Sequence, residues 1–259
     1  MAGLTLPTPL LRMLPIAGVI LFWWAMASSG AVRPFLLPSP IVVAERILAD
    51  VASGTVFVNV GYTLYRALTG FAIAAAIGTT IGLLMVVSRT AKWFFDPIVS
   101  VGYPMPKISL LPIFILWFGL DDASKIAMIA AGCIFVITAN AYAGASGVER
   151  QFVWSAQMLG ASRLRVLTDV VLPAATPQIL TGYQIAIPVS LIITLVTEMI
   201  MGGDGLGGQL LIASRYANSP AVFASIVEIA IAGAIVVNGM RLLRRKLLHW
   251  HEENAVSTD

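Results

Sequence analysis

Few side chains in this sequence are of the types that carry out nucleophilic, acid–base or metal chemistry. The single cysteine, Cys133, can form no disulfide within one chain and is expected to be a buried thiol. The two histidines, His249 and His251, flank Trp250, which favours an interfacial anchor at the carboxyl end over a metal pair. We therefore expect no catalytic or metal-binding constellation and no cofactor bound by this chain.

A glycine-rich run at residues 202–208 invites comparison with a phosphate-binding loop. It lacks the Lys-Ser/Thr ending that such a loop needs, and a single calcium-type glycine repeat is too short to bind a metal without neighbours. We expect a flexible external turn or a short break in a helix.

Three ionisable residues, Lys107, Glu198 and Glu228, lie within long apolar segments. Charges at membrane depth are costly and usually face a bundle interior or an aqueous path, so each is a candidate for a solute path. Alternatives stay open: Glu198 could lie among lipid headgroups, Glu228 could be protonated or hydrogen-bonded inside the bundle, and Lys107 could snorkel to the cytoplasmic interface. A Lys107 that faces a cavity would favour an anionic solute.

The segments that carry these residues are those of an integral membrane protein. Of 259 residues, 58% are hydrophobic and 11% are charged, and the charges cluster between long uncharged windows. Because about 20 residues cross the hydrocarbon as a helix, the windows predict six transmembrane helices. They cover residues 12–33, 66–89, about 94–119, 124–146, 169–198 and 216–241, and prolines interrupt the third.

Basic residues gather on one side of this six-helix arrangement. Arg89 and Lys92 share one loop, Arg150, Arg163 and Arg165 share another, and four more lie at the carboxyl end. The positive-inside rule places these loops and both termini in the cytoplasm. This asymmetry accounts for the net charge of +3 without a nucleic-acid partner.

The amino-terminal region predicts two helices. The first span resembles a signal peptide with a cleavage site at Ala25-Met26-Ala27, but bulky aromatic residues precede that site and we expect the helix to be retained. Residues 37–54 place charges between apolar residues, which indicates an amphipathic helix at the outer surface.

Small residues recur at every fourth position of the second span: Gly70, Ala74, Gly78 and Gly82. Such a stripe lets another helix approach closely. The partner helix lies either in this chain or in a second copy.

A polar stretch, residues 151–173, separates the fourth and fifth spans. Gly160 frees the backbone, Ser162 can cap a new helix, and Pro173 is expected to end that second helix. We therefore expect a short cytoplasmic helical hairpin, which in a membrane protein is a docking element for another protein.

The spacing of Gly160, nine residues, Val170, one residue and Leu172-Pro173 resembles the EAA loop of bacterial ABC-importer permeases, the membrane subunits of binding-protein-dependent transporters. Further segments extend the resemblance over nearly the whole chain and narrow it to the nitrate, sulfonate, taurine and bicarbonate branch. They include Leu37-Pro38-Ser39-Pro40, Leu110-Leu111-Pro112, Leu116-Trp117-Phe118-Gly119, Ser124-Lys125, Asn140 with Gly144, Thr181-Gly182, and Glu198-Met199 before Gly205-Leu206-Gly207.

The resemblance implies an all-α type I ABC-importer permease fold with a cytoplasmic coupling helix, in one transmembrane domain over residues 1–259 of the bacterial inner membrane. Residues 1–56 would form the first helix and external segment, 57–245 a five-helix core with the EAA-type loop at 148–173, and 246–259 a cytoplasmic tail. The chain would carry no ATPase site. A homodimer would act with two ATP-binding subunits, which hold ATP and Mg, and with an extracytoplasmic solute-binding protein.

The intramembrane charges and the resemblance together give two sets of site residues. The translocation-path set comprises Lys107, Asn140, Glu198 and Glu228, and the coupling set, which would contact the ATPase, comprises Trp154, Ala156, Met158, Leu159, Gly160, Ala161, Leu172 and Pro173. Where the family begins its loop with Glu-Ala-Ala, this chain has Trp154-Ser155-Ala156, so an acidic contact is missing. We hypothesise that apolar contacts from Trp154, Met158 and Leu159 replace it.

The resemblance implies nitrate, a sulfonate or taurine as the cargo, and a vitamin precursor or other small organic solute is the alternative within the family. An ion-coupled secondary transporter would use Glu198 and Glu228 but gives no reason for the hairpin. A membrane enzyme or scaffold is disfavoured because nucleophiles and acid–base pairs do not cluster.

Overall fold

The computed structural model describes residues 8–248, and every regular element in this part of the chain is helical, as the sequence predicts. A 3₁₀ turn, Lys107–Leu110, precedes α5, and a π-helical segment, Leu167–Val171, joins α8 to α9. The helices are α1 (Thr8–Ser28), α2 (Pro40–Ala52), α3 (Thr55–Val87), α4 (Arg89–Gly102), α5 (Leu111–Phe118), α6 (Asp122–Ser146), α7 (Arg150–Met158), α8 (Arg163–Val166), α9 (Leu172–Met201), α10 (Leu206–Arg215) and α11 (Ser219–Leu247). His249 and His251 lie outside the described residues.

Within residues 8–248, four helices are long and apolar enough to cross a membrane: α3, α6, α11 and the continuous helix 163–201 made by α8, the π-helical segment and α9. α4 and Lys107–Phe118 pass the same test as a pair bent by 102°, either one broken span or a re-entrant loop. The bend falls at Pro104 and Pro106, as expected from residues that lack a backbone donor. Leu14–Ser28 of α1 is a shorter apolar helix, so four spans of the described chain, or five with the bent pair, meet the test where the sequence predicts six, although all six segments are helical.

The stripe of small residues on α3 packs against α6 of the same chain, which identifies the partner helix. A Cβ added to Gly70, Gly78 or Gly82 would lie 2.6, 3.0 or 2.7 Å from an atom of α6, and Ala74 is fully buried. In lipid, van der Waals packing replaces the hydrophobic effect as the main attraction between helices. Close backbone approach is therefore what joins α3 to α6.

An adjoining face of α6 packs on α9, and α9 also contacts α3, so these three helices form the core. A Cβ on Gly182 of α9 would lie 2.6 Å from the Cβ of Asn140, and one on Gly144 of α6 would lie 2.7 Å from the Cβ of Gln178. The buried centre of this core includes Met128, Ile129, Cys133, Ile137, Ala186 and Ile193.

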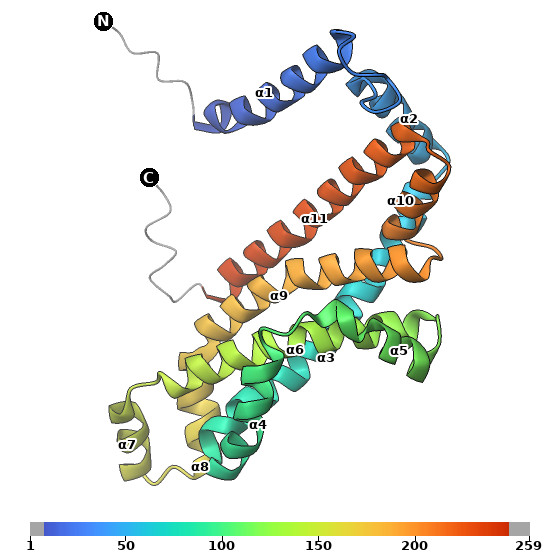
Figure 1. The fold of residues 1–259 in the computed structure, drawn as a ribbon. Helices are drawn as coiled ribbons and strands as arrows, with labels where there is room; N and C mark the ends of the chain where they lie inside the picture. Colours follow the sequence, from blue (N-terminus) through green and yellow to red (C-terminus); the bar gives the residue numbers. More distant parts are fainter. Residues whose placement is uncertain (1–7, 249–259) are drawn as a thin grey trace, which may run out of the picture.

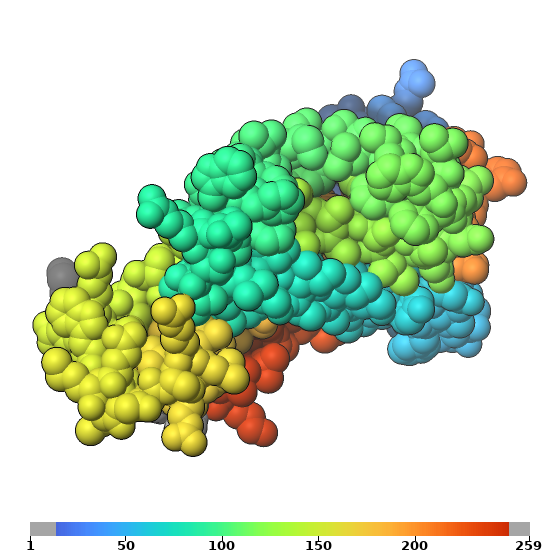
Figure 2. All heavy atoms as spheres, turned by 90° about the horizontal axis from the view of Figure 1, so that it is seen from below, coloured from blue at the N-terminus to red at the C-terminus, as the bar shows by residue number. Residues whose placement is uncertain are grey.

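The remaining helices frame the core (Figure 1). α7 and α8 lie at one end of the molecule, whereas α2, α5 and α10 lie at the other. α1 projects from the body and contacts it through Trp23, whose Nε1 donates to the carbonyl oxygen of Pro38 at 3.0 Å and whose ring stacks on Phe223 of α11. The space-filling view from below shows α4 and α5 lying over α3 and α6 (Figure 2).

α2 is the helix predicted within residues 37–54. Ser39 caps it by accepting a hydrogen bond from the N–H of Val42, and Pro40 occupies its first position, where a missing N–H costs nothing. The helix packs against α11 and α3.

Candidate functional site

The helical hairpin, residues 150–166, has a rigid turn that its sequence dictates. Gly160 adopts φ 80°, its N–H donates to the carbonyl oxygen of Gln157 at 2.9 Å, and the N–H of Ala161 donates to that of Ala156 at 3.0 Å. These two bonds form a Schellman motif, which satisfies the last carbonyls of α7. Ser162 then caps α8 by accepting from the N–H of Arg165. Both predicted turn residues are confirmed.

The predicted coupling residues of the hairpin divide into an outer and an inner group. Trp154, Met158 and Leu159 are 55%, 88% and 89% exposed. Ala156 and Ala161 instead pack on the buried cluster that also receives Leu172 of α9. The inner group fixes the hairpin to the helix ends, and the outer group presents three large apolar side chains at the end of the molecule.

Pro173 does not stop a helix, which corrects the sequence prediction. It lies at the second position of α9, and the chain continues helically from Arg163 to Met201. A proline ring clashes with the carbonyl four residues earlier, and the π-helical segment Leu167–Val171 widens the backbone at that place. The hairpin is therefore joined to α9 as one continuous rod.

Replacing Gly160 with alanine is expected to loosen the turn, because a left-handed conformation costs an L-residue about 1–2 kcal/mol. A Cβ there meets nothing within 4 Å, so the cost is in the backbone alone. Hydrogen exchange at the amide of Ala161 should accelerate about tenfold. The same change at Gly233, inside α11 and equally uncrowded, should not destabilise. Unaltered exchange in the Gly160 variant would contradict this account of the turn.

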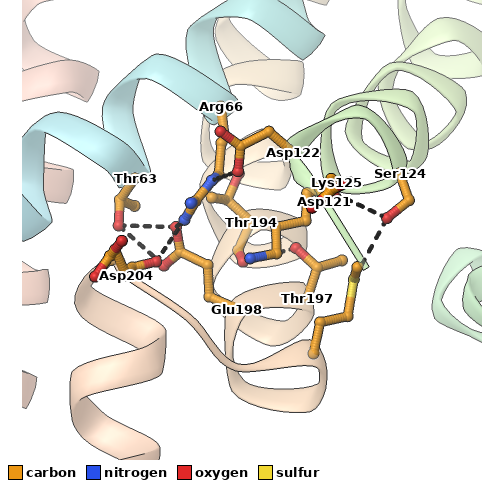
Figure 3. A network of polar contacts seen from close by, with 12 residues as sticks. Thr63, Arg66, Asp121, Asp122, Ser124, Lys125, Thr194, Thr197, Glu198 and Asp204 are labelled. Carbon is orange, nitrogen blue, oxygen red and sulfur yellow. Dashed lines mark hydrogen bonds and ion pairs between the residues drawn. The ribbon is translucent and has the colours of Figure 1, made fainter. Parts of the chain in front are cut away.

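A buried ion-pair network joins α3, α6 and α9 at the end of the molecule opposite the hairpin (Figure 3). Arg66 of α3 donates through Nε to Oδ1 of Asp122 and through Nη1 to Oε1 of Glu198, both at 2.7 Å. The side chain of Arg66 is 4% exposed and that of Glu198 is fully buried. Each buried charge is compensated, as the low-dielectric interior requires.

The carboxylate of Glu198 also holds the turn between α9 and α10. Thr63 Oγ1 and the N–H of Gly207 donate to its Oε2 at 2.9 and 3.0 Å. A Cβ on Gly205 would lie 2.4 Å from this carboxylate, and Gly205 has φ 118°. Of the two alternatives predicted for this run, the short break in a helix is present, and its glycines permit close packing on Glu198.

The position of Arg66 differs from the one predicted from the uncharged windows of the sequence. Such windows make it the boundary of the second span, whereas α3 begins at Thr55 and encloses it. Two carboxylates offset the cost of its burial, and the windows cannot detect such pairing. A signal was available: Asn59, Thr63 and Arg66 follow the spacing of one helix face, and each contacts the α9–α10 turn.

Lys125, at the start of the predicted fourth span, likewise lies inside. It is 3% exposed, and its Nζ donates to the carbonyl oxygen of Gly202 at 2.9 Å. It therefore caps the carboxyl end of α9, where a cation also complements the helix dipole.

The four predicted path residues do not come together in the structure. Glu198 is occupied by the ion-pair network. Asn140 donates to the carbonyl oxygen of Val136 and accepts from Gln178 at the α6–α9 contact. Lys107 is half-buried at the bend after α4, where its Nζ donates to the carbonyl oxygen of Tyr103. Glu228 of α11 is 4% exposed, and neither of its carboxylate oxygens has a hydrogen-bond partner among the described residues.

Both the sequence and the fold are similar to those of known transport proteins. The model of a family described as "binding-protein-dependent transport system inner membrane component" matches residues 70–249. A putative aliphatic sulfonates transport permease protein of Bacillus subtilis (strain 168) is 32% identical over 250 residues, which cover 96% of this chain and 87% of the relative. The taurine transport system permease protein of Escherichia coli (strain K12) is 32% identical over 243 residues, with coverages of 92% and 88%.

A solved structure with the same fold is titled as inward-facing conformations of the MetNI methionine ABC transporter. It superposes with a TM-score of 0.64 at 19% identity and covers 73% of this chain and 94% of that chain. At this identity the likeness concerns the fold, which matches the type I permease architecture predicted from the sequence.

Proposed function

The chain belongs to the family of binding-protein-dependent transport system inner membrane components, and we propose that it forms half of the translocation path of an ATP-driven importer for a small sulfonate-class anion. Two copies would enclose the path between them. The family makes the chain a multi-pass transport subunit of the inner membrane rather than an enzyme or an ion-coupled secondary transporter.

The hairpin is the proposed contact with the ATP-binding subunits. Its outer group, Trp154, Met158 and Leu159, supports this proposal, since large apolar side chains held out by a rigid turn are suited to fill a pocket on a partner. Because the hairpin continues into α9, a force applied to the hairpin by a bound subunit would also act on α9. A movement of the hairpin becomes a movement of a helix that crosses the molecule, which is how rigid-body switching is transmitted.

The remaining partners follow from the same premise. We place the hairpin and both termini in the cytoplasm because basic residues gather there, and ATP and Mg on the ATP-binding subunits. An extracytoplasmic binding protein would deliver the cargo to the end that carries the α9–α10 turn.

The proposed cargo is an aliphatic sulfonate or taurine, because two relatives with 32% identity are named for these solutes. Lys107, half-buried at the bend between α4 and α5, supports an anion, since it offers a positive charge at the bent helix pair. A vitamin precursor remains the alternative cargo within the family.

Transport by the reconstituted system tests the proposal. Proteoliposomes that contain the permease, its ATP-binding subunit and the binding protein encoded beside them should take up labelled taurine or an alkanesulfonate when ATP is present. Uptake without ATP, or uptake of an uncharged pyrimidine in place of both sulfonates, would overturn the assignment.

A further inference from the structure

An open cationic cavity lies beside the hairpin, lined by the ends of α3 and α6, the start of α4 and residues of α7 and α8. Its volume is about 670 Å³. Four basic residues, Arg89, Lys92, Arg150 and Arg163, line it, and the described residues that line it include no carboxylate. Figure 2 shows the hairpin beside α4 on this face of the molecule.

Three of the four cations occupy an unfavourable place in their helices. Arg89, Arg150 and Arg163 are the first residues of α4, α7 and α8, the last of which continues to Met201. The positive end of a helix dipole disfavours a cation there by about 0.3–1 kcal/mol. Helix stability therefore does not account for three arginines at these positions, whereas an anion between them would be stabilised by the arginines and by the helix ends.

Acidic residues near in sequence do not line this cavity. Glu149 lines a cavity between α6, α7, α9 and α11, and Asp96, whose charge acts on Lys92, lines one between α3, α4 and α6. Lys92 is held over the ring of Tyr142 with its Nζ 5.2 Å from the ring centroid, so its charge stays at the cavity.

The rest of the lining is largely apolar and includes Val86, Val153 and Leu167. The cavity also lies where α3, a membrane-crossing helix, ends at Val87. A purely inorganic anion would gain no binding energy from contact with the apolar side chains. A molecule with a phosphate head and an acyl body matches both parts of the lining, and basic pockets beside helix ends are places where such headgroups bind.

We propose that this cavity binds the phosphate headgroup of an anionic membrane phospholipid. The bound lipid would neutralise the three helix-start arginines and brace the inner side of the hairpin against the ends of α3 and α6. The site is separate from the outer group of the hairpin, and it does not depend on which solute is transported.

The test measures lipid retained by the purified permease–ATPase complex in nanodiscs of phosphatidylcholine with a small fraction of phosphatidylglycerol. The variant Arg89→Gln/Arg150→Gln/Arg163→Gln should retain at least about tenfold less phosphatidylglycerol than the unaltered complex. The matched control, Arg241→Gln/Arg245→Gln/Lys246→Gln, removes the same charge from the end of α11, outside the cavity, and should retain lipid normally.

Equal retention in the cavity variant and the control variant would overturn the proposal. If the triple variant fails to assemble, Arg89→Gln alone, which lies outside the hairpin, should still show a severalfold loss. A competition experiment, in which inorganic phosphate is added to the nanodiscs, distinguishes a lipid headgroup from a free anion. Phosphate that displaces no phosphatidylglycerol at moderate excess supports a lipid site, whereas saturation by phosphate with no added retention of lipid would overturn it in favour of a free anion.

Discussion

Replacing Glu198 with alanine is expected to lower the free energy of unfolding of the permease by about 3–5 kcal/mol. The substitution leaves Arg66, with a side chain 4% exposed, with the half-exposed Asp122 as its one remaining ion-pair partner among the described residues, and it removes the acceptor of Thr63 and Gly207. An uncompensated buried charge and orphaned donors each carry a desolvation cost. Unfolding in mixed micelles under rising denaturing detergent measures the difference.

A matched control and a double variant separate the ion pair from general damage. Glu45→Ala removes the same side chain from an exposed position of α2 and should change stability by less than about 0.5 kcal/mol. Arg66→Met/Glu198→Met removes both charges and should cost less than the sum of its two single changes, because contacting residues are not additive. Additive costs would show that the two side chains contribute independently.

Replacing Trp154 with alanine is expected to weaken binding of the ATP-binding subunit by about 2 kcal/mol, roughly 30-fold in Kd. The indole is half exposed on the hairpin, and it stands where the family carries an acidic residue. Tryptophan buries a large rigid area at low entropic cost, so its loss removes contact area that alanine cannot supply. Binding is measured by titrating the ATP-binding subunit onto immobilised permease.

Trp117→Ala is the matched control, since Trp117 is also exposed but lies on α5 at the other end of the molecule. It should leave ATPase binding unchanged. Equal affinity of the Trp154 variant and the unaltered permease would reject an apolar replacement for the missing acidic contact.

Sequence predicted the parts of this fold that depend on local rules. The apolar windows are helical in the structure, and Gly160 and Ser162 form the hairpin turn. The stripe of small residues from Gly70 to Gly82 lies at a contact between two helices. Each of these follows from the length, spacing or backbone preference of neighbouring residues. The identity of the stripe's partner, α6, required the tertiary arrangement.

The buried network could not be reached in the same way, because it depends on residues far apart in sequence. From sequence alone Arg66 is predicted to end a span, because its ion pairs with Glu198 and Asp122 are not visible there. The glycine-rich run at 202–208 shows no packing role in the sequence, whereas in the structure the carboxylate of Glu198 fills the space where a side chain at Gly205 would stand. From sequence alone Pro173 is predicted to end a helix, because the π-helical segment that accommodates it cannot be predicted from neighbouring residues. In all three cases the surrounding structure changes the energetic cost of placing that residue where it lies.

Cross-linking from the hairpin tests the central claim most directly. Cys133, the single cysteine, is fully buried, so Leu159→Cys introduces an accessible thiol for a photoreactive maleimide. Illumination of the assembled complex should link position 159 to the ATP-binding subunit, whereas Leu120→Cys, exposed beyond α5, should give no such product. A product from position 120 and none from position 159 would contradict the proposal that the hairpin docks on the ATP-binding subunit.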